Sequence, residues 1–319
     1  MIYTVTLNPG LDRTLEVDHI IFEEVLRARR TQLDWGGKGL NVARALQALS
    51  QESVVMGFLG GDTGRTLERG LHAMGITTDF TWIDDETRTN VVIQETGTGR
   101  HIKVNESGPV IGQEYQQALL EKVMQTAREG DWWVLCGSLP PGVPTDFYAR
   151  LVHKVHEKRA KAVLDTSGEA LRLGCIARPD LIKPNRLEAE QVVGFHLDTK
   201  AALGKAVRYF LDIGITMVAI SLGKEGLSLS TRSEAVHARP PQVGAPGAAV
   251  GAGDALLAGL VWALSQGKSL EEASRWGVAT GTAAAMRPGV EMGSRTDVEN
   301  VYQQVKINHW DTESTENVK

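Results

Sequence analysis

A run of small residues, Val250-Gly251-Ala252-Gly253, stands directly before Asp254 and an apolar helical pattern. Small residues let several backbone N–H groups converge on one point, and the amino end of a helix adds about half a positive charge there. Such a place suits a phosphate or a phosphoryl group in transfer. Asp254 would lie in the first helical turn, where it could either take a proton from an attacking hydroxyl or simply complement the helix dipole.

Asn185 and Glu188 follow an expected strand over residues 181–183. Side chains three residues apart share one face of a helix, so the two could hold a hydrated magnesium ion through water. The same spacing also makes a capping box, in which each side chain bonds the backbone of the other residue. The two residues by themselves leave both interpretations open.

Gly36-Gly37-Lys38-Gly39 and Asn41 form a third polar element, at the start of an expected helix. A glycine loop of this kind is a weak signal, because a tight turn would explain it. It lacks the GxGxxG spacing of a dinucleotide fold, which disfavours a nicotinamide dehydrogenase. A Walker A loop around Gly267-Lys268-Ser269 would need glycine where Trp262 stands.

The 319 residues are 42% hydrophobic and 23% charged, and they carry a net charge of -5. This composition excludes disorder, and without a basic run it disfavours nucleic acid as a partner. Cys136 and Cys175 are too far apart for a CxxC element, which fits a reducing compartment. No stretch approaches about 20 apolar residues and the first residues do not read as a signal peptide, so we expect a cytoplasmic protein without a membrane partner.

The elements that must position these residues alternate between β-branched runs and amphipathic helices. This alternation predicts an α/β fold with a mostly parallel central sheet. Strands are expected at residues 2–7, 54–59, 132–136, 162–165, 181–183 and 217–222. Their carboxyl ends share one edge, outside which ligands bind in open α/β sheets.

Other segments depart from this pattern. Residues 14–18 alternate with period two, and residues 89–96 and 100–105 form an expected hairpin through Gly97-Thr98-Gly99. Half-buried strands without intervening helices predict a small separate sheet. An edge extension of the main sheet is the alternative.

Taken together and in this order, the elements resemble the ribokinase-like (PfkB-type) carbohydrate kinases over nearly the whole chain. Within that family the chain looks most like the phosphosugar branch, which includes 1-phosphofructokinase and tagatose-6-phosphate kinase. The resemblance rests on Thr6-Leu7-Asn8-Pro9 with Asp12, Gly36-Gly37-Lys38-Gly39-Leu40-Asn41-Val42-Ala43, Thr87-Arg88-Thr89-Asn90, Gly137-Ser138-Leu139-Pro140-Pro141-Gly142, Asp165-Thr166-Ser167-Gly168-Glu169-Ala170-Leu171, Lys183-Pro184-Asn185 with Glu188, Ser221-Leu222-Gly223 and Gly251-Ala252-Gly253-Asp254.

The resemblance implies a three-layer α/β/α core with a small β-sheet lid, as a single kinase domain over residues 1–310. The lid segments would lie at about 12–35 and 86–105, and residues 311–319 would be a polar tail. Exposed edges of the lid strands could pair across two subunits, which would give a homodimer.

The resemblance also implies ATP-dependent phosphorylation of a ketohexose phosphate, with ATP and Mg²⁺ as cofactors. Fructose 1-phosphate, converted to fructose 1,6-bisphosphate, is the expected substrate, and tagatose 6-phosphate and fructose 6-phosphate remain alternatives. A non-catalytic sensor of a sugar phosphate or a nucleotide is an alternative of another class.

Individual roles follow from the matching motifs. Asp254 would be the catalytic base, and the backbone of Gly251, Ala252 and Gly253 would form the anion hole. The sugar phosphate would be bound by Asp12, Arg27, Gly37, Lys38, Asn41, Arg88, Lys103 and Ser138, with Asp12 and Asn41 on its hydroxyls. The nucleotide side would comprise Lys183, Asn185, Glu188, Ser221, Gly223 and Gly226, and Asn185 and Glu188 would hold magnesium through water.

One departure from the family pattern concerns a monovalent ion. The family usually has Asn-Thr or Asp-Thr shortly before the glycine run, and this chain has Ala248 and Ala249 there. Those side chains can supply no hydrogen bond or ion contact, so potassium is left out of the expected cofactors.

Overall fold

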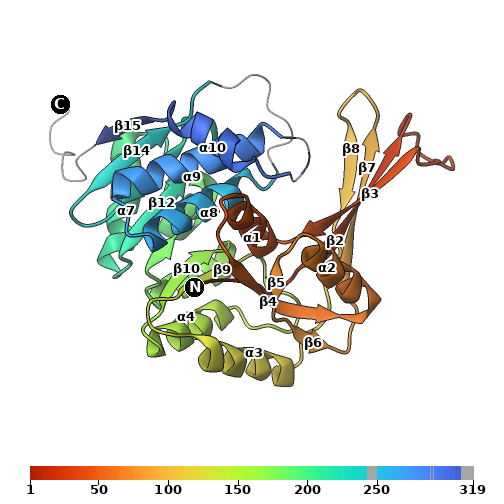
Figure 1. The fold of residues 1–319 in the computed structure, drawn as a ribbon, viewed down its shortest axis with the longest axis horizontal. Coiled ribbons are helices and arrows are strands. Elements are labelled where there is room, and N and C mark those ends of the chain that lie inside the picture. The colour runs from red at the N-terminus through yellow and green to blue at the C-terminus, as the bar shows by residue number, and fades with distance from the viewer. Residues whose placement is uncertain (243–249, 288, 290, 310–319) are drawn as a thin grey trace.

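The computed structural model describes residues 1–242, 250–287, 289 and 291–309. The departure at Ala248 and Ala249 and the tail over residues 311–319 therefore lie outside the described residues. Figure 1 shows a central sheet covered by helices on both faces and a second, smaller sheet beside it. Among the described helices, none combines the length and the apolar character that crossing a bilayer requires.

The main sheet of the described chain has eleven strands, in the order β15-β14-β13-β12-β11-β10-β9-β1-β4-β5, with β6 beside β4. Its parallel strands are β1 (Ile2–Thr6), β4 (Ser53–Gly60), β5 (Thr77–Thr78), β6 (Thr81–Ile83), β9 (Trp132–Cys136), β10 (Lys161–Asp165), β11 (Leu181–Ile182) and β12 (Met217–Ser221). An antiparallel extension consists of β13 (Leu227–Ser230), β14 (Ala235–Arg239) and β15 (Lys306–His309).

Both faces of the main sheet are buried, which explains why its strands are apolar at consecutive positions. In β9, Trp133 and Leu135 belong to the core on one face, and Val134 and Cys136 belong to the core on the other. The ring of Trp133 also stacks on Tyr3 of β1, with centroids 4.3 Å apart. The mostly parallel α/β prediction is confirmed.

Helices complete the three layers. One face is covered by α3 (Gln113–Thr126), α4 (Phe147–Glu157), α5 (Gly168–Ile176), α6 (Arg186–Val193) and α7 (Lys200–Asp212). The other face is covered by α1 (Lys38–Ala48), α8 (Ala252–Ser265), α9 (Leu270–Ala285) and α10 (Arg295–Tyr302). A third apolar cluster joins α2 (Gly61–Ala73) to α1 and β4.

The smaller sheet has the strand order β3-β2-β7-β8. Its strands are β2 (Gly10–Val17), β3 (Arg30–Gly36), β7 (Arg88–Glu95) and β8 (His101–Val104). The prediction of a separate sheet is confirmed, with β7 and β8 as its antiparallel hairpin, and the edge-extension alternative is wrong. Because β2 begins soon after β1 ends and β3 leads directly into α1, this sheet joins the core beside the glycine run at residues 36–39.

Candidate active site

Asp254 lies in the first turn of α8, and its side chain is almost fully buried. Gly251 precedes the helix with a φ of 80°, a left-handed conformation that favours glycine. Asn41 of α1 donates a hydrogen bond from Nδ2 to Oδ2 of Asp254 at 2.9 Å. The packing of α1 against α8 therefore brings the glycine run before Asp254 and the segment with Gly36-Gly37-Lys38-Gly39 and Asn41, which are the first and third polar elements of the sequence, to one point.

Burial and, after it, the negative charge of Asp165 raise the pKa of Asp254 to about 6. The hydrogen bond from Asn41 and the charges of Lys183 and Lys38 act in the opposite direction. A carboxylate with a pKa close to neutral pH is well matched to general-base catalysis. It is ionised at neutral pH and still basic enough to accept a proton.

Asp165, at the carboxyl end of β10, is fully buried and contacts two lysines. Lys38 Nζ lies 2.8 Å from its Oδ1, and Lys183 Nζ lies 3.1 Å from its Oδ2. The two ammonium groups lower the pKa of Asp165 although burial alone would raise it. The Asp165 and Glu188 carboxylates raise the pKa of Lys38 against the opposing effect of burial. Asp165 is thus an ionised counterion beside Asp254.

The expected nucleotide side lies at the ends of β11 and β12. Asn185 forms an isolated parallel bridge with Ser221. Asn185 Oδ1 accepts from Glu188 N, and Glu188 Oε2 accepts from Asn185 N, so the capping-box interpretation is confirmed. The other carboxylate oxygen of Glu188 remains 3.8 Å from Lys38 Nζ. Gly223 opens the 3₁₀ turn η1 (Gly223–Glu225), and Gly226 ends it.

The expected sugar side begins at β2. Asp12 Oδ1 accepts a hydrogen bond from Asn90 Nδ2 of β7 at 2.7 Å. A Cβ on Gly36 would lie 2.7 Å from the Asp12 carboxylate oxygens, so this carboxylate lies directly over the glycine run. Asn90 belongs to a motif that the sequence identified, but sequence reasoning gave it no role.

Several buried polar atoms at this site have no partner within the described chain. They include the side-chain oxygens of Asn41 and Asn90 and the Nε of Arg88. Buried polar groups are almost always hydrogen-bonded, and an orphaned one indicates a missing water or ligand. Two amide acceptors and a guanidinium donor suit a ligand that carries hydroxyls and an anionic group.

The remaining residues that were expected to bind the substrate have fewer contacts with the cluster around Asp254 and Asp165. Arg88 donates to the carbonyls of Asn8 at 2.9 Å and Glu106 at 3.1 Å. Ser138 is exposed just after β9. Arg27 and Lys103 are exposed on the smaller sheet and its connecting loop, and no contact within the described residues joins them to the Asp165 cluster. Gly37 precedes α1, where a Cβ would lie 2.9 Å from Thr6 Cγ2.

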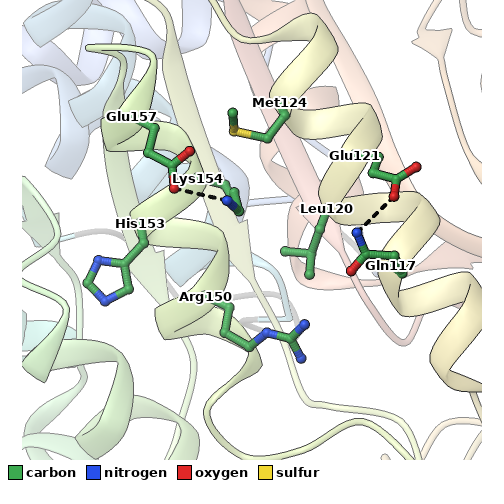
Figure 2. A pocket seen from close by; sticks show the side chains of 8 residues that line it. All are labelled: Gln117, Leu120, Glu121, Met124, Arg150, His153, Lys154 and Glu157. Atoms are coloured by element: carbon green, nitrogen blue, oxygen red, sulfur yellow. Dashed lines mark hydrogen bonds and ion pairs between the residues drawn. The ribbon is translucent and has the colours of Figure 1, made fainter.

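Surface pockets of the described chain lie outside the Asp165 cluster, and two of them border on helices or motifs named above. One, of about 310 Å³, includes Arg88 on its wall. The other, of about 410 Å³, lies between α3 and α4 (Figure 2). The polar side chains at its edge form contacts within their own helix: Gln117 with Glu121 in α3, and Lys154 with Glu157 in α4. It contains none of the residues that the sequence predicted for the site.

Comparisons with known proteins agree with this geometry. The model of the pfkB family of carbohydrate kinases matches residues 7–297. The 1-phosphofructokinase of Bacillus subtilis (strain 168) is 34% identical over 310 residues, which cover 96% of this chain and 99% of that protein. The D-tagatose-1-phosphate kinase of Bacillus licheniformis is 34% identical over 315 residues, covering 97% and 100%.

Among solved structures, phosphofructokinase-2 from Escherichia coli in complex with potassium superposes with a TM-score of 0.91. It is 30% identical, and the match covers 95% of this chain and 98% of that one. The ribokinase-like fold expected from the motifs is therefore confirmed. The chain belongs to the pfkB family of carbohydrate kinases.

Proposed function

We propose that this protein transfers the γ-phosphoryl group of ATP to a hydroxyl of fructose 1-phosphate, with fructose 1,6-bisphosphate and ADP as products. The observation that carries the proposal is the buried Asp254 at the start of α8, hydrogen-bonded to Asn41 and flanked by Lys38 and Lys183. The relatives named 1-phosphofructokinase support the choice of sugar phosphate.

Asp254 acts as the general base. As the sugar hydroxyl oxygen bonds to the γ-phosphorus, the bond from that phosphorus to the bridging oxygen breaks and ADP leaves. Asp254 takes the hydroxyl proton, and the amides at the start of α8 stabilise the charge on the phosphoryl oxygens. Positioning and charge stabilisation supply most of the rate in such transfers.

Magnesium would be held on the nucleotide side by Asn185 and Glu188 through water. In the described residues no group of three or more His, Cys, Asp or Glu could hold a metal by itself. Mg²⁺ usually keeps several waters and binds one or two carboxylates plus substrate phosphates, so the single carboxylate of Glu188 fits it. When bound, the ion would neutralise charge on the ATP phosphates.

Sugar recognition would use the Asp12 carboxylate and the buried polar atoms that lack partners within the described residues. Asp12, Asn41 and Asn90 offer hydrogen-bond acceptors to the ketose hydroxyls. Arg88 offers its Nε as a donor to the phosphate that the sugar already carries. Gly37 and Ser138 would line this side, and Arg27 and Lys103 would reach the phosphate only when the smaller sheet closes over the substrate. That closure would also keep water from acting as the acceptor.

The competing substrate is a tagatose phosphate, because one close relative is named D-tagatose-1-phosphate kinase. Purified protein should be assayed by coupled ADP release with fructose 1-phosphate, fructose 6-phosphate, tagatose 1-phosphate and tagatose 6-phosphate. Fructose 1-phosphate is expected to give the highest kcat/KM. A higher value for another sugar would replace the substrate, and binding without ADP release from any of them would favour the sensor alternative.

The lid role, the homodimer and the cytoplasmic location remain predictions. Phe22, Val25 and Leu33 are exposed apolar side chains on or beside β3, which is an edge strand of the smaller sheet. An exposed edge with apolar neighbours could pair with a second copy. Light scattering of the purified protein would give the mass of the assembly directly.

The pH dependence of the reaction should follow Asp254. Since the pKa of this group is about 6, it is protonated and inactive as a base below that pH. We expect kcat/KM to rise with pH through about 6 and then level off, measured by ADP release from about pH 5 to about pH 8. Thermal unfolding at each pH is the control, and a flat profile in folded protein would contradict the assignment.

A further inference from the structure

Asp165 is a carboxylate to which the mechanism above gives no role. It is wholly inaccessible to solvent, and its two oxygens contact lysines from different parts of the chain. Lys38 belongs to the first turn of α1, which follows the smaller sheet, whereas Lys183 follows β11 on the nucleotide side. Burying such a group is costly, and buried ion pairs are weak devices for stability alone.

The two ammonium groups lie close to the reacting centre. A Cβ on Gly253 would be 3.9 Å from Lys183 Nζ, so this ammonium lies beneath the start of α8. The Lys183 side chain is almost fully buried, whereas that of Lys38 is one-third exposed (34%) and so remains accessible to a ligand. Both lysines are close enough to act electrostatically on Asp254.

We infer that Asp165 is a positioning residue that holds Lys38 and Lys183 as a pair of cations for the phosphoryl group in transfer. This inference rests on the proposed kinase function. Lys38 comes from the expected sugar side and Lys183 from the expected nucleotide side. The Asp165 carboxylate therefore fixes the positions of two ammonium groups, one near each substrate. Lys38 then contacts the transferred group, and the resident phosphate of the sugar is left to Arg88.

Asp165 also acts on the base. The groups that face Asp254 are Asp165 on β10, Lys38 and Asn41 on α1, Lys183 after β11, and the thiol of Cys136 on β9. Asp165 is the carboxylate among them, and its charge raises the pKa of Asp254. Removing that charge should lower this pKa, so the acid limb of the pH profile should move to lower pH.

The test is Asp165→Asn, which keeps the shape and removes the charge. We expect kcat to fall about 100-fold, as for other losses of alignment at a reacting centre. The KM values for both ATP and fructose 1-phosphate should rise, and the acid limb should move to lower pH. A purely structural ion pair would lower the melting temperature without moving the acid limb.

Asp180→Asn is the matched control. Asp180 is also a largely buried carboxylate, and it contacts Lys161 at 2.8 Å and His156 at 2.9 Å. Lys161 is the first residue of β10 and Asp165 is the last. The Asp180 carboxylate therefore forms its ion pair at the opposite end of the strand from Asp165. The control variant should keep the kinetic constants and pH profile of the parent. Equal changes in both variants, or parental kinetics in Asp165→Asn, would overturn the inference.

A double variant covers the case in which Asp165→Asn does not fold. Asp165→Asn combined with Lys38→Met removes one of the lysines left without a counterion. Because Lys183 also loses its partner, kcat of the double variant should fall below that of Lys38→Met, but by clearly less than the 100-fold expected when Asp165 is changed alone. An undiminished 100-fold fall would contradict the coupling of Asp165 to Lys38. The parent enzyme is assayed first, so an inactive parent would refute the proposed function and not the role of Asp165.

Discussion

Asp254→Asn should lower kcat by about 100- to 10,000-fold, which is the usual contribution of a general base. Asparagine has the same shape and can still accept the hydrogen bond from Asn41 Nδ2 through its side-chain oxygen. It cannot accept a proton at neutral pH. Affinity for fructose 1-phosphate should therefore remain close to that of the parent, while turnover falls.

The measurement combines ADP release with titration calorimetry of the sugar phosphate. Asp62→Asn is the matched control, because Asp62 is an exposed first-turn carboxylate of α2 that pairs with Arg65 at 2.8 Å and complements the helix dipole. It should leave kcat unchanged. If both variants kept full turnover, Asp254 would also be a helix-dipole residue and the proposed mechanism would lose its base.

The core strands were predictable because a strand that is buried on both faces has apolar residues at consecutive positions. Residues 132–136 were expected as a strand and form β9 with the same bounds, since every position is apolar. The expected strand over 162–165 begins one residue earlier in β10. Continuous apolar runs between turn residues leave little freedom in where such strands begin and end.

The polar edge strand β3 was not predicted. β3 reads Arg-Thr-Gln-Leu-Asp-Trp-Gly, and most of its side chains are exposed or half-buried, so no apolar alternation marks it. The antiparallel extension β13, β14 and β15 was also missed. Its strands are four or five residues long, and serines occupy two of the buried positions of β13.

The candidate site was predictable where a motif is local and not where it depends on tertiary contacts. The glycine run before Asp254 and the Asn185 capping pair are short-range signals. Asp165 meets Lys38 across 127 residues, and Asn90 meets Asp12 across 78, so no spacing reveals either contact. The available signal for Asp165 was its place at the carboxyl end of a buried strand, where ligand sites form.

Gly253→Val is expected to leave the protein folded and nearly inactive. Among the described residues, a Cβ at this position has only Lys183 Nζ within 4 Å, at 3.9 Å, so the branch point of a side chain fits without displacing the backbone. It would stand over that ammonium, at the place where the amides of α8 are proposed to receive the phosphoryl group. Loss of access to such donors should lower kcat/KM for ATP by about 100- to 1,000-fold.

Gly267→Ala, just beyond the opposite end of α8, is expected to lower stability and leave activity unchanged. Its φ is 70° and no other part of the described chain lies within 4 Å of the added Cβ, so the expected penalty is that of a left-handed alanine, about 1–2 kcal/mol. It should melt at a lower temperature and keep its activity, whereas Gly253→Val should melt near the parent and lose activity. Because the two variants separate stability from catalysis, an active Gly253→Val enzyme would show that the phosphoryl group does not pass over the start of α8.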